Sequence, residues 1–201
     1  MIKTFFFDIG NVLLNIYSEE VVRQFTRAIG VETTVMVSAL FGEMHDDYEK
    51  GGLTDEQFFS GVMANIASEK KLTQTEFFDC WRSMLGDVTE TFHYARELSK
   101  TITVWLASNT NQHHINHGGV RNKMNGFSGA IYSFDVGARK PDECFFKAML
   151  TAANANASES FFVDDRMENV AAAGKMGMTV IHYRSHGQFV KDFESLNPEI
   201  S

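Results

Sequence analysis

The apolar run Phe5–Phe7, which stops at the carboxylate of Asp8 and turns at Gly10, most constrains the fold of this chain. A stretch that is apolar on both faces is typical of a parallel strand whose sheet is covered by helices, so we expect a strand over residues 2–7. Open α/β sheets bind ligands at the carboxyl ends of their strands, where Asp8 would stand. By itself the pattern is more typical of a turn than of a catalyst, so other strand ends must support a site.

The composition indicates one substantial core, with or without a smaller lobe. The chain has 201 residues and is 44% hydrophobic, with 18 Phe and 10 Met, which is too apolar for a disordered protein. Its formal net charge is -8 and it contains no block of Lys or Arg. Because it lacks the basic footprint that binds a phosphate backbone, we expect no nucleic-acid partner.

Cysteine usage and the first residues indicate the compartment. Cys80 and Cys144 are far apart and form no redox or metal-binding motif, which fits buried thiols in a reducing compartment. The apolar run before Asp8 is too short for a signal peptide or a membrane span. We expect a soluble cytoplasmic protein without membrane contact, either a monomer or a homodimer.

The segment from residue 15 to residue 86 shows helix signals and no strand signal. The signals are, in order, a Ser18 cap, a helix end at Gly30, a helical stretch over residues 33–49, and capping boxes that begin at Thr54 and Thr73. An all-helical segment directly after the first strand is unusual in an α/β chain. We therefore predict a helical cap over residues 15–86, inserted into a core made of residues 1–14 and 87–201.

After residue 87, strand patterns alternate with helix patterns. We expect strands at residues 102–107, 130–134, 161–163 and 178–182, with helices near 88–99, from Pro141 in the first turn, and from about 168 to 177. This alternation is typical of a parallel sheet with right-handed crossovers. The fold class is therefore α/β, with a parallel sheet of five strands or more.

Polar residues follow four of these strands. They are Asp8, Ser108 with Asn109, Lys140, and the pair Asp164 and Asp165. Carboxylates from separate strands can hold Mg²⁺, which also takes phosphate oxygens as ligands. A hydroxyl and a lysine ammonium can bind the remaining phosphate oxygens, and a free carboxylate can attack phosphorus to form an aspartyl-phosphate.

Four motifs in this order resemble those of the haloacid dehalogenase superfamily, and the resemblance covers nearly the whole chain. The matching stretches are residues 7–13 (Phe-Asp-Ile-Gly-Asn-Val-Leu), 107–111 (Ala-Ser-Asn-Thr-Asn), 137–141 (Gly-Ala-Arg-Lys-Pro) and 162–169 (Phe-Val-Asp-Asp-Arg-Met-Glu-Asn). The residues of these motifs are most similar to those of the bacterial superfamily members that act as phosphatases on alpha-D-glucose 1-phosphate. The resemblance implies a Rossmann-like three-layer core with a helical cap.

The resemblance also implies roles for individual residues. Asp8 would be the nucleophile and, with the Gly10 carbonyl and Asp165, a Mg²⁺ ligand. Ser108 and Lys140 would be catalytic phosphate binders. The remaining site residues would be Asn109, Gly10 and Asn11 at the phosphate, and Asp164 and Asn169 in support of the metal.

Gly10 departs from the superfamily pattern, because most phosphatases of this kind have a second aspartate there as general acid/base. A backbone carbonyl suffices for a metal ligand, so metal binding is retained while a proton carrier is lost. We expect a Mg²⁺-dependent phosphatase that acts on a small phosphorylated metabolite, with sugar phosphates such as a hexose 1-phosphate first. The alternatives are a 2-haloacid dehalogenase, a phosphomutase, or a non-catalytic regulator that binds a phosphorylated ligand.

Two further clusters have simpler interpretations. His113 and His117 would share a helix face with His114 beside them, but without a third ligand at metal spacing we favour histidines on the surface or at the site rim over zinc. For a second cluster, contact with the substrate is the alternative, and a solvated helix face is the preferred interpretation. That cluster consists of Glu43, His45, Asp46 and Glu49.

Overall fold

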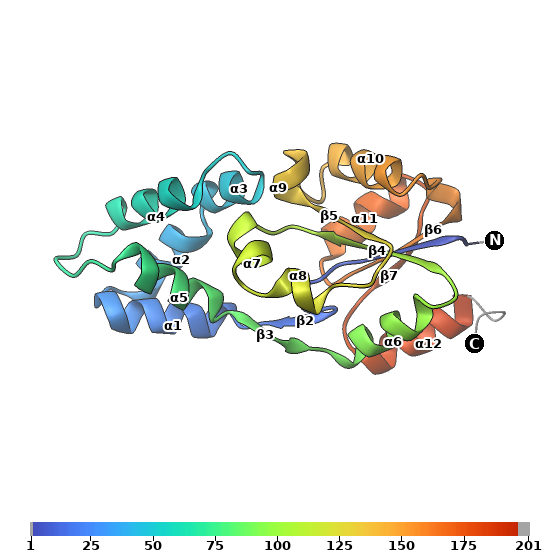
Figure 1. The fold of residues 1–201 in the computed structure, drawn as a ribbon, viewed down its shortest axis with the longest axis horizontal. Coiled ribbons are helices and arrows are strands. Elements are labelled where there is room, and N and C mark those ends of the chain that lie inside the picture. The colour runs from blue at the N-terminus through green and yellow to red at the C-terminus, as the bar shows by residue number, and fades with distance from the viewer. Residues whose placement is uncertain (1, 197–201) are drawn as a thin grey trace.

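A computed structural model describes residues 2–196 of the chain. Its core is a five-stranded parallel sheet in the order β5-β4-β1-β6-β7, so the first strand of the chain lies at the centre (Figure 1). The strands are β1 (Thr4–Phe7), β4 (Thr103–Ser108), β5 (Gly129–Tyr132), β6 (Ser160–Asp164) and β7 (Thr179–His182). The predicted α/β fold with a parallel sheet is confirmed.

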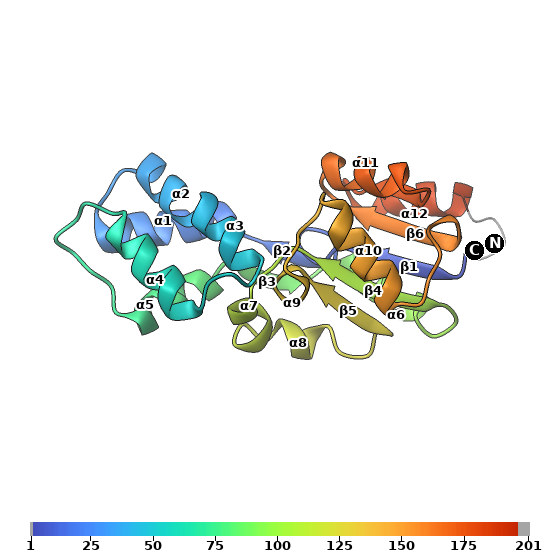
Figure 2. The same cartoon turned by 90° about the horizontal axis from the view of Figure 1, so that it is seen from above.

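Helices cover both faces of the sheet, which makes it the middle of three layers (Figures 1 and 2). One face is covered by α6 (Glu90–Leu98) and α12 (His186–Leu196), and the other by α10 (Glu143–Ala152) and α11 (Met167–Lys175). Side chains alternate between faces along a strand, so Phe5 and Phe7 pack on the first face and Phe6 on the second. All three are fully buried, as the apolar run predicts.

Short elements complete the core at the carboxyl edge and between the last strands. They are α7 (Gln112–Asn116), α8 (Val120–Lys123), α9 (Ser133–Val136) and the 3₁₀ helix η1 (Ala157–Glu159).

Five helices between β1 and β4 form a cap with its own hydrophobic core (Figure 1). They are α1 (Ser18–Ile29), α2 (Thr33–Phe41), α3 (Glu43–Glu49), α4 (Asp55–Ala64) and α5 (Gln74–Arg82). Phe25, Phe58, Phe77 and Trp81 are fully buried there, and their rings pack against one another. The capping boxes predicted at Thr54 and Thr73 open α4 and α5.

The prediction that residues 15–86 contain no strand is wrong. β2 (Leu14–Ile16) and β3 (Leu85–Val88) form a two-stranded antiparallel ribbon through which the chain enters and leaves the cap. Both strands are short, and they pair only because the inserted segment returns to its starting point. A pattern that depends on such a distant partner is not visible in either strand alone.

Two helix predictions in the cap need correction. Ser18 is the first residue of α1 and not its cap; Tyr17 holds the cap position, without a capping hydrogen bond from its side chain. The stretch over residues 33–49 is broken at Gly42, whose backbone is extended. A Cβ at Gly42 would lie 2.7 Å from the Ser38 carbonyl, so the absence of a side chain permits this close passage.

Three further predictions also differ from the structure. The third expected strand ends at Tyr132 because Ser133 already begins α9. Pro141 follows a cis peptide bond and precedes the first turn of α10, which starts at Glu143. The two thiols are not buried: Cys80 is half-buried and Cys144 is exposed.

Across residues 2–196, every helix is too short or too polar to cross a lipid bilayer.

The capping box of α5 gives a test of the cap's local stability. Thr73 Oγ1 accepts the backbone N–H of Glu76 at 3.3 Å, and the Glu76 carboxylate accepts the backbone N–H of Thr73 at 2.8 Å. We expect Thr73→Ala to lower the free energy of unfolding by about 1 kcal/mol, measured by urea denaturation. The matched control, Thr34→Ala in the first turn of α2, should change it by less than about 0.5 kcal/mol; equal effects would contradict the capping role.

Candidate active site

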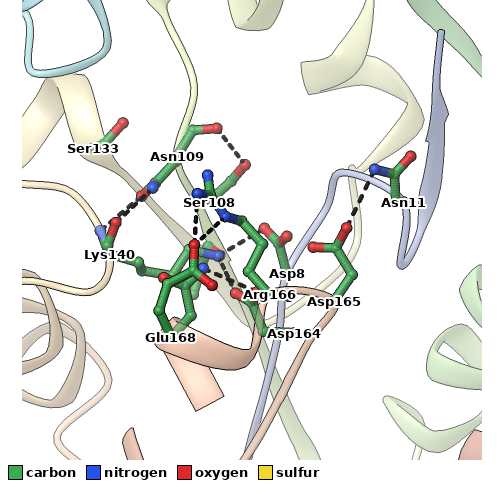
Figure 3. A network of polar contacts seen from close by, with 12 residues as sticks. Asp8, Asn11, Ser108, Asn109, Ser133, Lys140, Asp164, Asp165, Arg166 and Glu168 are labelled. Carbon is green, nitrogen blue, oxygen red and sulfur yellow. Dashed lines mark hydrogen bonds and ion pairs between the residues drawn. The ribbon is translucent and has the colours of Figure 1, made fainter. Parts of the chain in front are cut away.

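A buried lysine joins the ends of two central strands. Lys140 Nζ donates to Asp8 Oδ1 at 2.8 Å, to Asp164 Oδ2 at 2.6 Å and to the Ala107 carbonyl at 2.7 Å (Figure 3). An ammonium group has three N–H donors, so the protein satisfies all of them. Burial alone would lower the pKa of Lys140, but the charges of Asp164 and Asp8 raise it above its usual value. Lys140 is therefore a fixed positive charge.

Asp8 lies directly after β1, at the floor of a cavity. Its backbone N–H donates to the Val163 carbonyl at 2.9 Å, which continues the pairing of β1 with β6. Burial raises the pKa of Asp8 to about 7; Asp164 and Asp165 add to the shift, and Lys140 opposes it. Oδ1 receives the lysine, while Oδ2 has no donor within the described part of the chain.

Asp164, at the end of β6, is fully buried and supports the lysine from below. Its Oδ1 accepts the Arg166 backbone N–H and Asn169 Nδ2, each at 2.9 Å, and its Oδ2 accepts Lys140. Both oxygens are thus occupied by protein donors. The arrangement fits the predicted supporting role of Asp164 and Asn169, and the support reaches the site through Lys140.

Asp8 and Asp165, which are predicted to hold Mg²⁺, come together at this edge with Asp164, which is predicted to support the metal. Asp8, Asp164 and Asp165 each place a carboxylate oxygen within 4.8 Å of the others, and burial raises the pKa of Asp165. Crowded carboxylates of this kind are stabilised by a hard divalent cation. Gly10 lines the same cavity, and no backbone N–H in the described chain donates to its carbonyl. The donor set therefore fits Mg²⁺.

Two asparagines that are predicted to bind phosphate have side chains that form hydrogen bonds with other residues of the site (Figure 3). Asn109 Oδ1 accepts the backbone N–H of Lys140 at 2.8 Å, and its Nδ2 donates to the Lys140 carbonyl at 2.9 Å. Asn11 Nδ2 donates to Asp165 Oδ2 at 3.2 Å, and its Oδ1 accepts the Ile16 backbone N–H at 3.2 Å. These side chains position Lys140 and Asp165, and direct phosphate binding by Asn109 and Asn11 stays a prediction.

Ser108 lies at the end of β4 and lines the cavity, with its hydroxyl 3.3 Å from the Asn109 carbonyl. A second serine was missed by the sequence analysis. Ser133 Oγ exchanges two hydrogen bonds of 2.9 Å with the backbone of Thr110 and so fixes the loop after β4. Like Ser108, Ser133 is a small polar residue at the end of a strand. The sequence does not indicate this, because the strand expected there includes Ser133.

The cavity, of about 260 Å³, lies between this edge and the cap. From the cap it is lined by side chains that include His45 and Glu49 of α3, and the core contributes Arg139 opposite them. Arg139 Nη2 lies 2.8 Å from Glu49 Oε2, and its other terminal nitrogen pairs with Asp46. The interpretation of this cluster as a solvated helix face is wrong for His45 and Glu49; of its four members only Glu43 is exposed.

The three histidines at α7, of which His117 directly follows the helix, are not on the surface as a group. His113 and His114 are buried, and only His117 is exposed. Asp55 lies near enough to His113 and His117 to complete a metal-sized group. However, Arg82 Nη1 donates a hydrogen bond to His113 Nε2 at 2.9 Å, so the ring proton is on Nδ1, which donates to Asp55 Oδ2 at 2.7 Å. This network fits a hydrogen-bonded contact between cap and core better than a zinc site.

The fold and the site together define an α/β protein with an acidic centre between its core and a helical cap. The sequence model of the haloacid dehalogenase-like hydrolases matches residues 2–177. The chain belongs to this family of hydrolases, as its motifs predict.

Individual relatives are distant. A D-ribitol-5-phosphate phosphatase of Bacteroides thetaiotaomicron is 24% identical over 190 residues, which cover 88% of this chain and 89% of that protein. The drimenol cyclase drtB of Aspergillus calidoustus is 23% identical in an alignment that is 215 residues long with its gaps. This alignment covers 98% of this chain and 37% of that protein. The chain thus spans little more than a third of the length of that fungal relative.

Solved structures of the family share the fold. A haloacid dehalogenase family enzyme from Bacteroides thetaiotaomicron, in complex with magnesium and inorganic phosphate, superimposes with a TM-score of 0.81 at 24% identity. The superposition covers 92% of this chain and 96% of that one.

The metal-binding prediction can be tested without any assay of activity. We expect Mg²⁺ to raise the free energy of unfolding of chelator-treated protein by about 2.7 kcal/mol at 100 times its Kd, followed by thermal unfolding. Asp165→Ala should lose more of this stabilisation than Asn169→Ala, because it removes a charge as well as a ligand. Full stabilisation of Asp165→Ala by Mg²⁺ would exclude Asp165 as a ligand.

Proposed function

We propose that this chain is a Mg²⁺-dependent phosphatase that hydrolyses a small phosphorylated metabolite through an aspartyl-phosphate on Asp8. The observation that carries the proposal is the setting of Asp8, whose Oδ1 is held by Lys140 while Oδ2 is left free at the cavity floor. The relative named as a phosphatase and the structural neighbour with magnesium and phosphate support it.

The residues of this chain divide the work between them. Lys140 orients Asp8 and favours its ionised, nucleophilic form, because the ammonium lies 2.8 Å from the carboxylate. Ser108 would bind a phosphate oxygen from the cavity wall. Asp8, Asp165 and the Gly10 carbonyl would hold Mg²⁺, which when bound neutralises charge on the transferring phosphoryl group.

The reaction would take place in two displacements. First, Asp8 Oδ2 attacks phosphorus, the bond to the substrate oxygen breaks, and the alcohol leaves. Water then attacks the same phosphorus and the bond to Asp8 breaks, which restores the carboxylate and releases phosphate.

Two features support a sugar phosphate, and a hexose 1-phosphate in particular. The cavity of about 260 Å³ is smaller than most ligand pockets, which measure roughly 300–1,000 Å³. Gly10 offers no proton to the leaving oxygen. An anomeric oxygen leaves more easily than an ordinary alkoxide because the ring oxygen withdraws electron density, so a 1-phosphate depends less on the missing proton.

The nucleophile is tested by Asp8→Asn, which keeps the side-chain shape but replaces the attacking carboxylate with an amide. We expect turnover of phosphorylated metabolites with Mg²⁺ to fall by at least about 10³-fold, with an unchanged circular dichroism spectrum. The exposed Asp87→Asn is the matched control and should keep full activity. Phosphate release at the wild-type rate by Asp8→Asn would refute the assignment, and ligand-induced stabilisation of the wild type without any turnover would favour a non-catalytic regulator.

The role of Gly10 is tested by comparing glucose 1-phosphate with glucose 6-phosphate. We expect the wild type to have the higher kcat/KM for the 1-phosphate. Gly10→Asp should reduce that preference, because a general acid contributes about 10² to 10⁴ in rate mainly to the poorer leaving group. A Cβ at Gly10 would lie 3.4 Å from Ile16 Cγ1, so the substitution is sterically mild. A wild-type preference for the 6-phosphate would contradict the leaving-group argument.

A further inference from the structure

The second displacement raises a question that Gly10 leaves open, and the inference below rests on the proposed function. A water molecule that attacks the aspartyl-phosphate must lose a proton, and the position two residues after Asp8 has no side chain to accept it. A good leaving group removes the need for a proton carrier in the first displacement only. The nucleophile of the second is the same water whatever the substrate, so a base is required there.

Most titratable groups that line the cavity are already committed. Asp8 is the nucleophile, Asp165 is the proposed metal ligand, and Lys140 is fixed between two carboxylates. Burial lowers the pKa of His114 to about 3. Its ring nitrogens already contact Asn111 Nδ2 at 3.2 Å and the backbone carbonyl of the cap's buried tryptophan at 3.4 Å, so His114 is unsuited to exchange protons with water.

His45 is the uncommitted group. Its side chain is 15% exposed, it lines the cavity, and among the described residues no hydrogen bond ends on either ring nitrogen. The nearest charged atom is Glu49 Oε1, 3.7 Å from His45 Nε2. Glu49 is itself paired with Arg139 through its other oxygen. This ion pair holds the Glu49 side chain in place beside His45, so Glu49 can orient the ring.

The packing around His45 fixes where the ring lies. Its ring contacts Phe41 of α2, Phe58 of α4 and Trp81 of α5, with centroid separations of 5.4, 6.3 and 5.7 Å. Three apolar partners from three helices hold one ring orientation in the roof of the cavity. In an in-line displacement the attacking water lies on the side of phosphorus opposite Asp8, which is the side that the cap covers.

We propose that His45 is the general base of the second displacement and that Glu49 is its positioning residue. Water oxygen bonds to phosphorus while one water proton passes to a neutral ring nitrogen of His45. The bond between phosphorus and Asp8 breaks, and its electron pair returns to the carboxylate. The imidazolium then releases the proton to solvent, and the leaving alkoxide of the first displacement takes its proton from solvent.

The electrostatics of the roof are consistent with a base. Burial lowers the pKa of His45, an effect that Arg139 of the core strengthens and that Glu49 and Asp46 of its own helix oppose. His114 of α7 is the other titratable group near the ring, and its pKa of about 3 keeps it uncharged. His45 is therefore mainly neutral near pH 7, which is the form that accepts a proton.

The test separates the two displacements kinetically. The probe is glucose 1-phosphate with Mg²⁺, and the variant is His45→Asn. We expect kcat to fall by about 10² or more, while kcat/KM, which reports steps up to release of the alcohol, stays within about threefold. The variant should show a burst of glucose release and retain phosphate on Asp8, seen by intact-protein mass after an acid quench.

Controls define what each outcome means. The exposed His93→Asn should behave as wild type, and Gly10→Asp combined with His45→Asn should recover kcat by supplying a new base. His45→Gln repeats the measurement with a longer amide in case the first variant unfolds. A parallel fall in kcat and kcat/KM, or no change in either, would overturn the role of His45 while leaving the phosphatase proposal intact. A wild type that is inactive on glucose 1-phosphate and on the other phosphorylated metabolites tested with Mg²⁺ would overturn both.

Discussion

The burial of one ammonium group between two carboxylates is the interaction on which the rest of this site depends. Lys140 carries a full charge with 3% of its surface exposed, and such a charge is tolerated in a protein interior only when it is paired and fully hydrogen-bonded. Removing one partner of a buried pair costs about 3–5 kcal/mol. The surrounding polar residues can be understood as the means of keeping this lysine in place. Asn109 holds its backbone on both sides, and Asp164 holds its ammonium.

The core and its strand ends could be predicted because their causes are local. An apolar run that stops at a polar residue marks the end of a buried strand, and parallel strands bring those ends to one edge. The sequence therefore predicts Asp8, Ser108 and Asp165 as site residues, and all three line one cavity in the structure. Lys140 is predicted together with them, but it reaches the edge from the loop before α10 and not from the end of a strand.

The roof of the cavity could not be predicted for an equally physical reason. The helical period of α3 indicates that His45 and Glu49 lie on one face, but not which surface that face meets. Its partner, Arg139, is far away in the sequence, and the contact exists only after the cap packs on the core. The pairing of β2 with β3 and the hydrogen bond between His113 and Asp55 also join segments that are distant in the sequence, so neither could be predicted. Arg139 also immediately precedes Lys140. The residue that forms an ion pair with the cap and the residue that binds the nucleophile therefore lie in the same short loop.

The position of β1 at the centre of the sheet has a consequence for the way the chain acquires its structure. Thr4 pairs with Thr103 on one side and with Ser160 on the other, so β1 gains its first neighbour in the sheet only after the whole cap has been synthesised. Most contacts between cap helices join a helix to the next one in the sequence, and local contacts form faster than distant ones. The cap can therefore be in place while Phe5, Phe6 and Phe7 are still exposed. During synthesis this apolar segment is the part of the nascent chain most in need of protection from aggregation.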